Sequence, residues 1–150
     1  MTQLPGLSAK YESLVGRLQQ FWFELTGRFG GKYSNPEFAW NNPVAPTAIR
    51  FLYSHELGER YVNDAFVAIF NTGYIFHFEL NDDRTEFVLD GDLADGAADE
   101  FNEADDLVFA KNFGRITDMA IGPDDYLDVL AIHGLEGTIY IIIPAGNNQP

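Results

Sequence analysis

Three histidines, His55, His77 and His133, are the side chains of this sequence best suited to proton transfer or metal binding near neutral pH. They share no metal-ligand spacing, so they do not indicate a local metal site. The chain contains no cysteine, which removes thiolate ligands and cysteine nucleophiles. We therefore expect a strand histidine such as His77 to be packed or hydrogen-bonded rather than a metal ligand.

Other motifs that could bind phosphate, calcium or an acyl group are incomplete. "GGK" at residues 30–32 looks like the end of a phosphate-binding loop, but Thr26 replaces its first glycine and Tyr33 its magnesium-binding Ser or Thr. No G-x-S-x-G motif surrounds a serine. The acidic series Asp90, Asp92 and Asp95 faintly resembles a calcium loop, but its third acid stands one place late and the distal glutamate is missing. A solvated acidic loop is the favoured interpretation, and we do not expect calcium to bind this chain.

Composition limits the classes of function further. The chain has 150 residues, of which 46% are hydrophobic and 15% aromatic, so it can form one domain with a sizeable core. Its formal net charge of −14 argues against nucleic acid and anionic membranes as partners. The N-terminus lacks the pattern of a signal peptide, and no apolar run is long enough to span a membrane. We therefore expect a soluble, cytoplasmic protein.

The elements that must position any site change type along the chain. Residues 1–29 predict a helical segment, with an amphipathic helix from about residue 9 to 26. Its apolar stripe could pack on the core of the protein or bind a partner, and the first is favoured. The stripe includes Leu14, Leu18, Trp22 and Leu25.

From residue 30 to 150 the apolar pattern has a period of two, which predicts strands. We expect antiparallel pairing of residues 65–70 with 74–79 across "NTG", and of 116–121 with 126–132 across "GPDD". The acidic stretch 90–106 separates the two hairpins and reads as an exposed loop. No helices alternate with these strands, so the fold class is mainly β rather than α/β.

Several motifs occur in an order that points to a known family. "WNNPVAP" precedes a strand, followed by "NDAFV", "GRITD" and "GPDD". With the segments around them, from about residue 30 to 144, they resemble the C-terminal blades of the soluble glucose/sorbosone dehydrogenases. These enzymes are six-bladed β-propellers that use pyrroloquinoline quinone (PQQ). The resemblance implies a partial β-propeller of two to three antiparallel blade-type sheets, preceded here by the N-terminal helix.

The resemblance also implies which residues would lie next to the quinone. Arg115 matches the first of two arginines that hold the quinone in this family, whereas Thr117 replaces the second and Asn71 replaces a lysine. Trp40 lies in the loop stiffened by Pro43 and Pro46. In a propeller its ring could stack on the planar cofactor or a sugar, or could simply fill the entrance of the central channel. Arg115 itself has a competing structural role, in which it pairs with a carboxylate such as that of Asp118.

Two further residues depart from the family pattern. Asp125 stands in the turn where the family has glycine, so it must adopt a positive φ. Asp128 replaces an aromatic residue in the next strand, which predicts that its face of the sheet is wet or that the carboxylate is paired.

Length sets the final limit on function. A six-bladed propeller with blades of roughly 40–50 residues needs more than about 250 residues, and the family's catalytic histidine and calcium ligands belong to earlier blades. The resemblance thus implies the C-terminal portion of a PQQ-dependent sugar dehydrogenase-like propeller, inactive alone and completed by missing blades. The alternative is a non-catalytic blade-type β domain for assembly or ligand binding. Two or three blades leave sheet faces uncovered, so we expect self-association as well.

Overall fold

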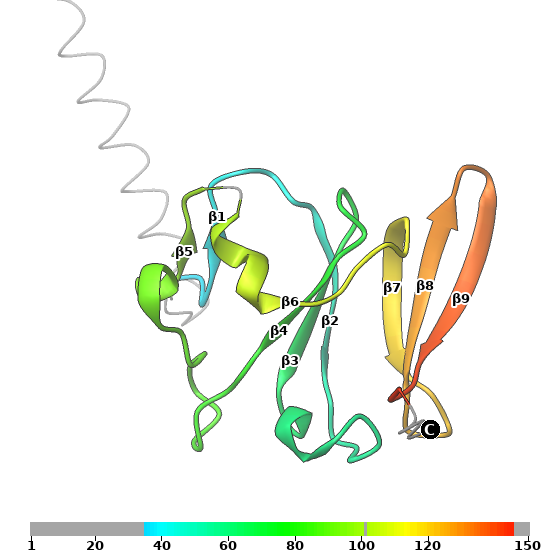
Figure 1. Cartoon of the computed structure of the whole chain (residues 1–150), viewed down its shortest axis with the longest axis horizontal. Coiled ribbons are helices and arrows are strands. Elements are labelled where there is room, and N and C mark those ends of the chain that lie inside the picture. The colour runs from blue at the N-terminus through cyan, green and yellow to red at the C-terminus, as the bar shows by residue number, and fades with distance from the viewer. Residues whose placement is uncertain (1–34, 101, 146–150) are drawn as a thin grey trace, which may run out of the picture. The chain divides into compact units, whose positions relative to one another are not determined.

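The computed structural model describes residues 35–100 and 102–145 of the chain (Figure 1). The chain divides into two units between Pro36 and Glu37, and nearly all of the description concerns the second. The second unit is mainly β, with three small sheets and short 3-10 turns. The predicted helical segment 1–29 lies outside the described residues. No helix in the described ranges is long and apolar enough to cross a membrane.

The largest sheet has four strands, each antiparallel to its neighbours. In spatial order they are β2 (Pro46–Phe51), β3 (Ala65–Ile69), β4 (Ile75–Phe78) and β6 (Val108–Ala110). The predicted hairpin across "NTG" is confirmed: Ala65 pairs with Phe78 and Ala68 with Ile75. Gly73 in its turn has a φ of 68°, a conformation that glycine adopts without a steric penalty.

The second sheet has three antiparallel strands, β7 (Arg115–Ile121), β8 (Leu127–His133) and β9 (Glu136–Ile142). The hairpin across "GPDD" is confirmed, since Ile121 pairs with Leu127 and Arg115 with Ile132. Asp125 has a φ of 64°, as predicted for a residue that takes the place of glycine.

The third sheet corrects the prediction that all sheets are antiparallel. β1 (Ala39–Trp40) runs parallel to β5 (Ala97–Ala98) over two residue pairs. Parallel neighbours need a long connection, and here most of the four-stranded sheet lies between them in the sequence.

The acidic stretch 90–106 is also more ordered than the exposed loop that we predicted. It contains the 3-10 turn η2 (Gly91–Leu93), strand β5 and the 3-10 turn η3 (Glu103–Leu107). Its carboxylates are mostly exposed, but Leu93, Ala98 and Ala104 are buried. These few apolar side chains anchor the stretch to the four-stranded sheet, because burying them removes apolar area from water.

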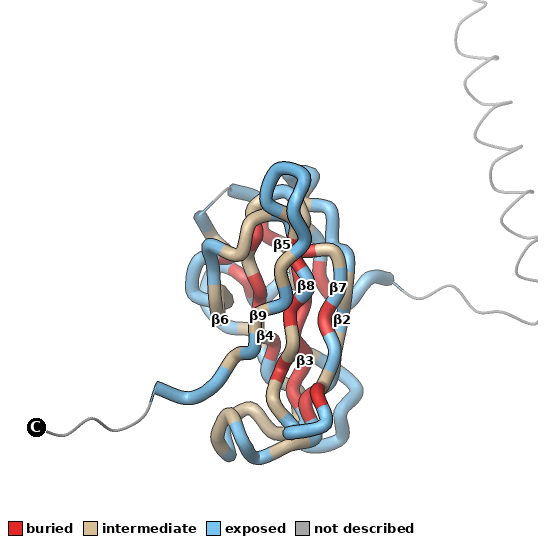
Figure 2. Tube along the Cα trace, turned by 90° about the vertical axis from the view of Figure 1, so that its right-hand side faces the viewer, coloured by how far each residue is buried: buried red, intermediate tan, exposed pale blue. Residues whose placement is uncertain are grey.

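Two hydrophobic cores lie on opposite faces of the four-stranded sheet. Val67 and Phe76 pack on one face with Leu93 and Ala104 from the acidic stretch. Alternate residues of the same strands pack on the other face against β7 and β8. All five residues of β3 are therefore buried, and Figure 2 shows buried positions along β3 and β8. The core between the sheets comprises Leu52, Phe66, Ala68, Ile75, Ile116, Met119, Leu127, Val129 and Ala131.

The chain enters this sheet by a constrained route. Pro46 is the first residue of β2, where the missing N–H is tolerated. Ala45 has a φ of 57°, and its carbonyl accepts a hydrogen bond from the backbone N–H of Phe70 at 3.0 Å. The proline thus follows a sharp backbone turn that is held by the end of β3.

Candidate functional site

The β3–β4 turn, residues 71–73, lies between two other connections at one end of the sheets. On one side, Asn71 Nδ2 donates a hydrogen bond to the Pro43 carbonyl in the β1–β2 connection, at 3.1 Å. On the other side, Gly73 lies against Gly114: a Cβ at Gly73 would be 2.0 Å from the Gly114 carbonyl oxygen. Figure 1 shows the three connections at the upper end of the sheets. The turn therefore brings the segment of Asn71 close to that of Arg115.

Arg115 is exposed at the start of β7. Its guanidinium lies 5.7 Å from the centre of the Phe70 ring, next to Asn71 in the sequence. Among the described residues Arg115 forms no ion pair, and Asp118 pairs instead with Arg50 at 2.8 Å. The predicted pairing of Arg115 with Asp118 is therefore wrong. Strand β2 lies close to β7, so Arg50 is near enough to bind that carboxylate instead.

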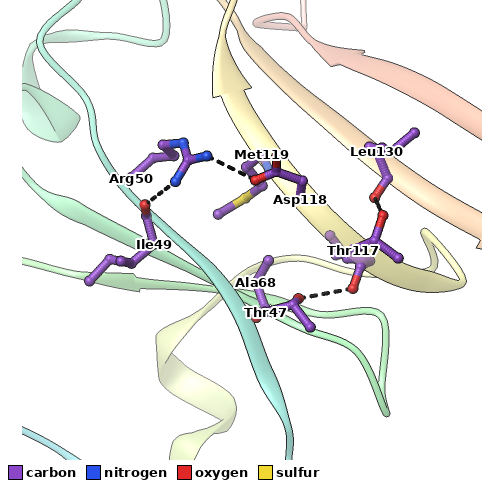
Figure 3. A network of polar contacts seen from close by, with 9 residues as sticks. Thr47, Ile49, Arg50, Ala68, Thr117, Asp118, Met119 and Leu130 are labelled. Atoms are coloured by element: carbon purple, nitrogen blue, oxygen red, sulfur yellow. Dashed lines mark hydrogen bonds and ion pairs between the residues drawn. The ribbon is translucent and has the colours of Figure 1, made fainter.

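Thr117 is engaged within its own sheet. Its Oγ1 donates to the Leu130 carbonyl on β8 at 3.2 Å (Figure 3). Beside it, Thr47 Oγ1 of β2 donates to the Ile116 carbonyl at 2.9 Å and links the two sheets. The position that carries the second arginine in the resembled family thus contributes to sheet structure here.

Trp40 lies on the other side of the 71–73 turn. Its ring packs edge-on against Phe38 at a centroid distance of 4.8 Å and is tilted against Phe76 at 5.7 Å. It joins the core on the sheet face that looks away from β7. The structure thus brings Asn71 and Arg115 to one corner but leaves Trp40 in a separate aromatic cluster.

A PQQ site would need several cations aimed at the carboxylates of the quinone, because the cofactor is a tricarboxylate. At this corner the candidate residues supply one cation, Arg115, and one neutral amide, Asn71, which is already bonded to Pro43. Thr117 and Trp40 both face other partners. These residues alone do not fit the charge of the cofactor. Within the described ranges no cluster of three or more His, Asp or Glu side chains could hold a metal ion.

One partly buried polar pair, formed by Asp64 and His77, was not predicted as a pair. Asp64 is 5% exposed and accepts a hydrogen bond from the Leu80 N–H at 3.0 Å, while its other oxygen lies 2.8 Å from His77 Nε2. The Tyr61 ring packs edge-on against the imidazole. His77 is therefore a hydrogen-bonded strand histidine, as predicted. Its partner could have been suspected from the sequence, because Asp64 stands directly before the fully apolar strand β3.

A second feature that the sequence did not indicate is a small cavity beside Trp40. It has a volume of about 40 Å³ and is lined in part by Trp40, Thr72 and Tyr74. Trp40 Nε1 and Thr72 Oγ1 are both buried and have no hydrogen-bond partner in the described part of the chain. Buried polar atoms without partners are rare in folded proteins, so these two atoms are unusual for a packed region.

Comparison with known proteins finds no protein-family model, no curated protein and no solved structure that matches this chain.

Proposed function

We propose that this chain is a blade-type β module of propeller-like design whose role is assembly, and that it is not a self-contained enzyme. The observation that carries the proposal is the uncovered outer face of the β7–β9 sheet. Leu130 is 41% exposed on this face, and Ile139 and Ile141 are 68% and 54% exposed. Strand register supports a common face, because Leu130 lies opposite Ile139. A row of large apolar side chains of this kind is typical of an interaction surface.

The two larger sheets also differ in completeness. β2, β3 and β4 are followed by a fourth strand, β6, whereas β7, β8 and β9 have no fourth strand among the described residues. In that part of the chain β9 pairs with β8 alone and leaves one edge of a seven-residue strand open. An open edge has unpaired N–H and C=O groups that can pair with another strand.

The occupant that we propose for this surface is a second copy of the chain. Residues 137–145 contain no charged side chain, in a protein of net charge −14. Two copies repel each other least where the approaching surfaces carry no charge. Antiparallel pairing of β9 with its copy would join the two sheets and continue the isoleucine row across a two-fold axis.

Asp128 lies on the same face of the sheet as this isoleucine row. It lies opposite Ile141, and its Oδ1 is buried without a hydrogen-bond partner in the described ranges. Of the two predicted situations, a paired carboxylate is not found for this oxygen in the described ranges, whereas the face itself is exposed to solvent at Leu130 and Ile139.

Light scattering over a concentration series tests this role. The wild-type chain is expected to form dimers in the micromolar range, and the double variant Ile139→Lys, Ile141→Lys is expected to be monomeric because it places charge at the interface. Val88→Lys is the matched control, since Val88 is 52% exposed and lies outside the sheets. At about 0.1 mM, an interface with a dissociation constant in the micromolar range would be almost fully formed. A wild-type chain that is still monomeric at that concentration would contradict the proposal.

A second candidate function is the PQQ-binding portion of a sugar dehydrogenase-like propeller, completed by blades from another chain. It is favoured by the sequence resemblance and by Arg115, which is exposed beside the Asn71 turn and forms no ion pair among the described residues. If the quinone binds, Arg115→Ala should weaken binding at least tenfold, or about 1.4 kcal/mol, in a titration followed by visible absorbance. Arg50→Ala is the control, because Arg50 already pairs with Asp118. Equal binding by wild type and Arg115→Ala would exclude a quinone site at this corner.

A further inference from the structure

β9 is the outermost strand of the three-stranded sheet, and it is uncharged over most of its length (Figure 1). Its sequence, EGTIYII, has one charged side chain, Glu136, at its first position. The chain as a whole is strongly acidic, with 23 Asp and Glu residues against 9 Lys and Arg residues. Two copies that meet at this apolar edge therefore bring two negatively charged surfaces close together.

The carboxylates of the chain have few basic partners. In the part of the chain that the structure describes, the only ion pair of an arginine or lysine joins Arg50 to Asp118, and both side chains are more than a third exposed. The other two ion pairs there involve the histidines His55 and His77. Most of the negative charge thus lies on exposed carboxylates, whose repulsion depends on screening by salt.

Strand register places one of these carboxylates at the proposed contact. If all seven residues of β9 pair antiparallel with a second copy, the pairing is symmetric about the middle of the strand and Glu136 lies opposite Ile142 of that copy. Within each copy Ile142 pairs with Leu127. Neighbouring strands are about 4.8 Å apart, so Glu136 lies on the order of 10 Å from Leu127 of the second copy. Asp124 and Asp125 are exposed in the turn that leads into Leu127.

Each copy thus brings Glu136 near the acidic turn of the other, and the two-fold axis repeats this repulsion. We propose that ionic strength regulates assembly through β9, with dimers favoured at high salt and monomers at low salt. This inference rests on the proposed dimer, whose apolar contact salt does not weaken. The screening length is about 30 Å at 0.01 M salt and about 3 Å at 1 M. Charges on the order of 10 Å apart therefore repel at the lower concentration and are screened at the higher one.

Sedimentation velocity of the full chain at about 0.01 M and about 1 M sodium chloride tests the regulation. The dissociation constant of the dimer is expected to be micromolar at the higher concentration and at least tenfold larger at the lower one. Dimers whose dissociation constant changes by less than tenfold would overturn the regulation but leave the proposed dimer intact. Monomers at both salt concentrations, with the protein at about 0.1 mM, would overturn the dimer and its regulation together.

Salt also strengthens apolar contacts, and Glu136→Gln separates that effect from screening. The variant keeps the shape of the side chain and removes one carboxylate per copy from the contact. At about 0.1 M salt, where the screening length is about 10 Å, it should dimerise at least twofold more tightly than wild type. At about 1 M salt the two should dimerise equally.

Glu86→Gln is the matched control, because it removes the same charge at a distance from β9. Glu86 is exposed in the loop after β4, next to Phe87, which packs on the sheet face that looks away from β7. Its variant should dimerise like wild type at about 0.1 M salt, since distant charges are screened there. Equal tightening by both variants, or tightening by neither, would overturn the role of Glu136 and of charge repulsion at this edge.

Discussion

The four-stranded and three-stranded sheets are built from similarly apolar strands but differ in how they are covered. β3, with the sequence AFVAI, is buried at every position, because side chains pack on both faces of its sheet. β9, with the sequence EGTIYII, has no buried position. The comparison shows that the apolar content of a strand does not determine its burial, which depends on what lies on each face.

The two sheets also differ in how their polar groups are satisfied. The buried carboxylate of the four-stranded region, Asp64, has partners for both oxygens in His77 and the Leu80 N–H. The half-buried carboxylate of the three-stranded sheet, Asp128, has a buried oxygen without one among the described residues. Incomplete covering and an incomplete hydrogen-bond set thus occur on the same sheet.

The largest expected difference between the two sheets concerns stability. Phe66 is fully buried between them and packs against Phe109 at 4.9 Å. Phe66→Ala should lower the free energy of unfolding by about 3–5 kcal/mol, because it removes a large side chain and leaves a cavity. Ile139→Ala, on the uncovered face, should cost less than about 1 kcal/mol when measured on the monomer. Urea unfolding at low protein concentration measures both values, and equal losses would show that β9 is covered after all.

The buried pair of Asp64 and His77 provides the next contrast. Asp64→Ala should cost about 2–4 kcal/mol, because it leaves the Leu80 N–H and the imidazole without their acceptor. The matched control is Glu59→Ala, which breaks an exposed pair with His55 and should change stability by less than about 0.5 kcal/mol. A similar loss in both variants would mean that burial does not strengthen the first pair.

The strands and hairpins of this fold could be predicted from the sequence, because alternating apolar residues and turn residues act locally. The "NTG" and "GPDD" hairpins and the positive φ of Asp125 are confirmed in this way. The order of the acidic stretch could not be predicted, since it depends on the burial of Leu93, Ala98 and Ala104 against a distant sheet face.

The candidate site could be predicted only in part. Asn71 and Arg115 lie close together because Gly73 is in close contact with Gly114. That this corner binds a cofactor stays a prediction. The partner of Asp118 was predicted wrongly, because the sequence does not specify how closely β2 approaches β7. The unpartnered atoms beside Trp40 were also missed, since a cavity arises from packing among several segments rather than from any one motif.

Gly73 provides a smaller test at the junction of the two sheets. Gly73→Ala combines a positive φ with a collision against the Gly114 carbonyl and should cost about 2–3 kcal/mol. Gly134→Ala, in the β8–β9 turn, has a similar φ of 63° but no atom within 4 Å of the added Cβ. It should cost only about 1 kcal/mol, the contribution of the backbone conformation. Thermal unfolding of the two variants isolates the collision, and equal costs would contradict a tight junction.

The smallest expected effect concerns the polar links between the sheets. Thr47→Val removes the hydrogen bond to the Ile116 carbonyl and should lower the free energy of unfolding by about 1 kcal/mol, independent of salt. Arg50→Ala removes the ion pair with Asp118, whose side chains are 38% and 57% exposed, and should cost about 0.2–1 kcal/mol at low salt. This second cost should largely disappear at 1 M salt, where the screening length is about 3 Å. Urea unfolding at both salt concentrations distinguishes the two links. A salt-sensitive loss in Thr47→Val would show that the approach of β2 to β7 depends on the ion pair rather than on the threonine.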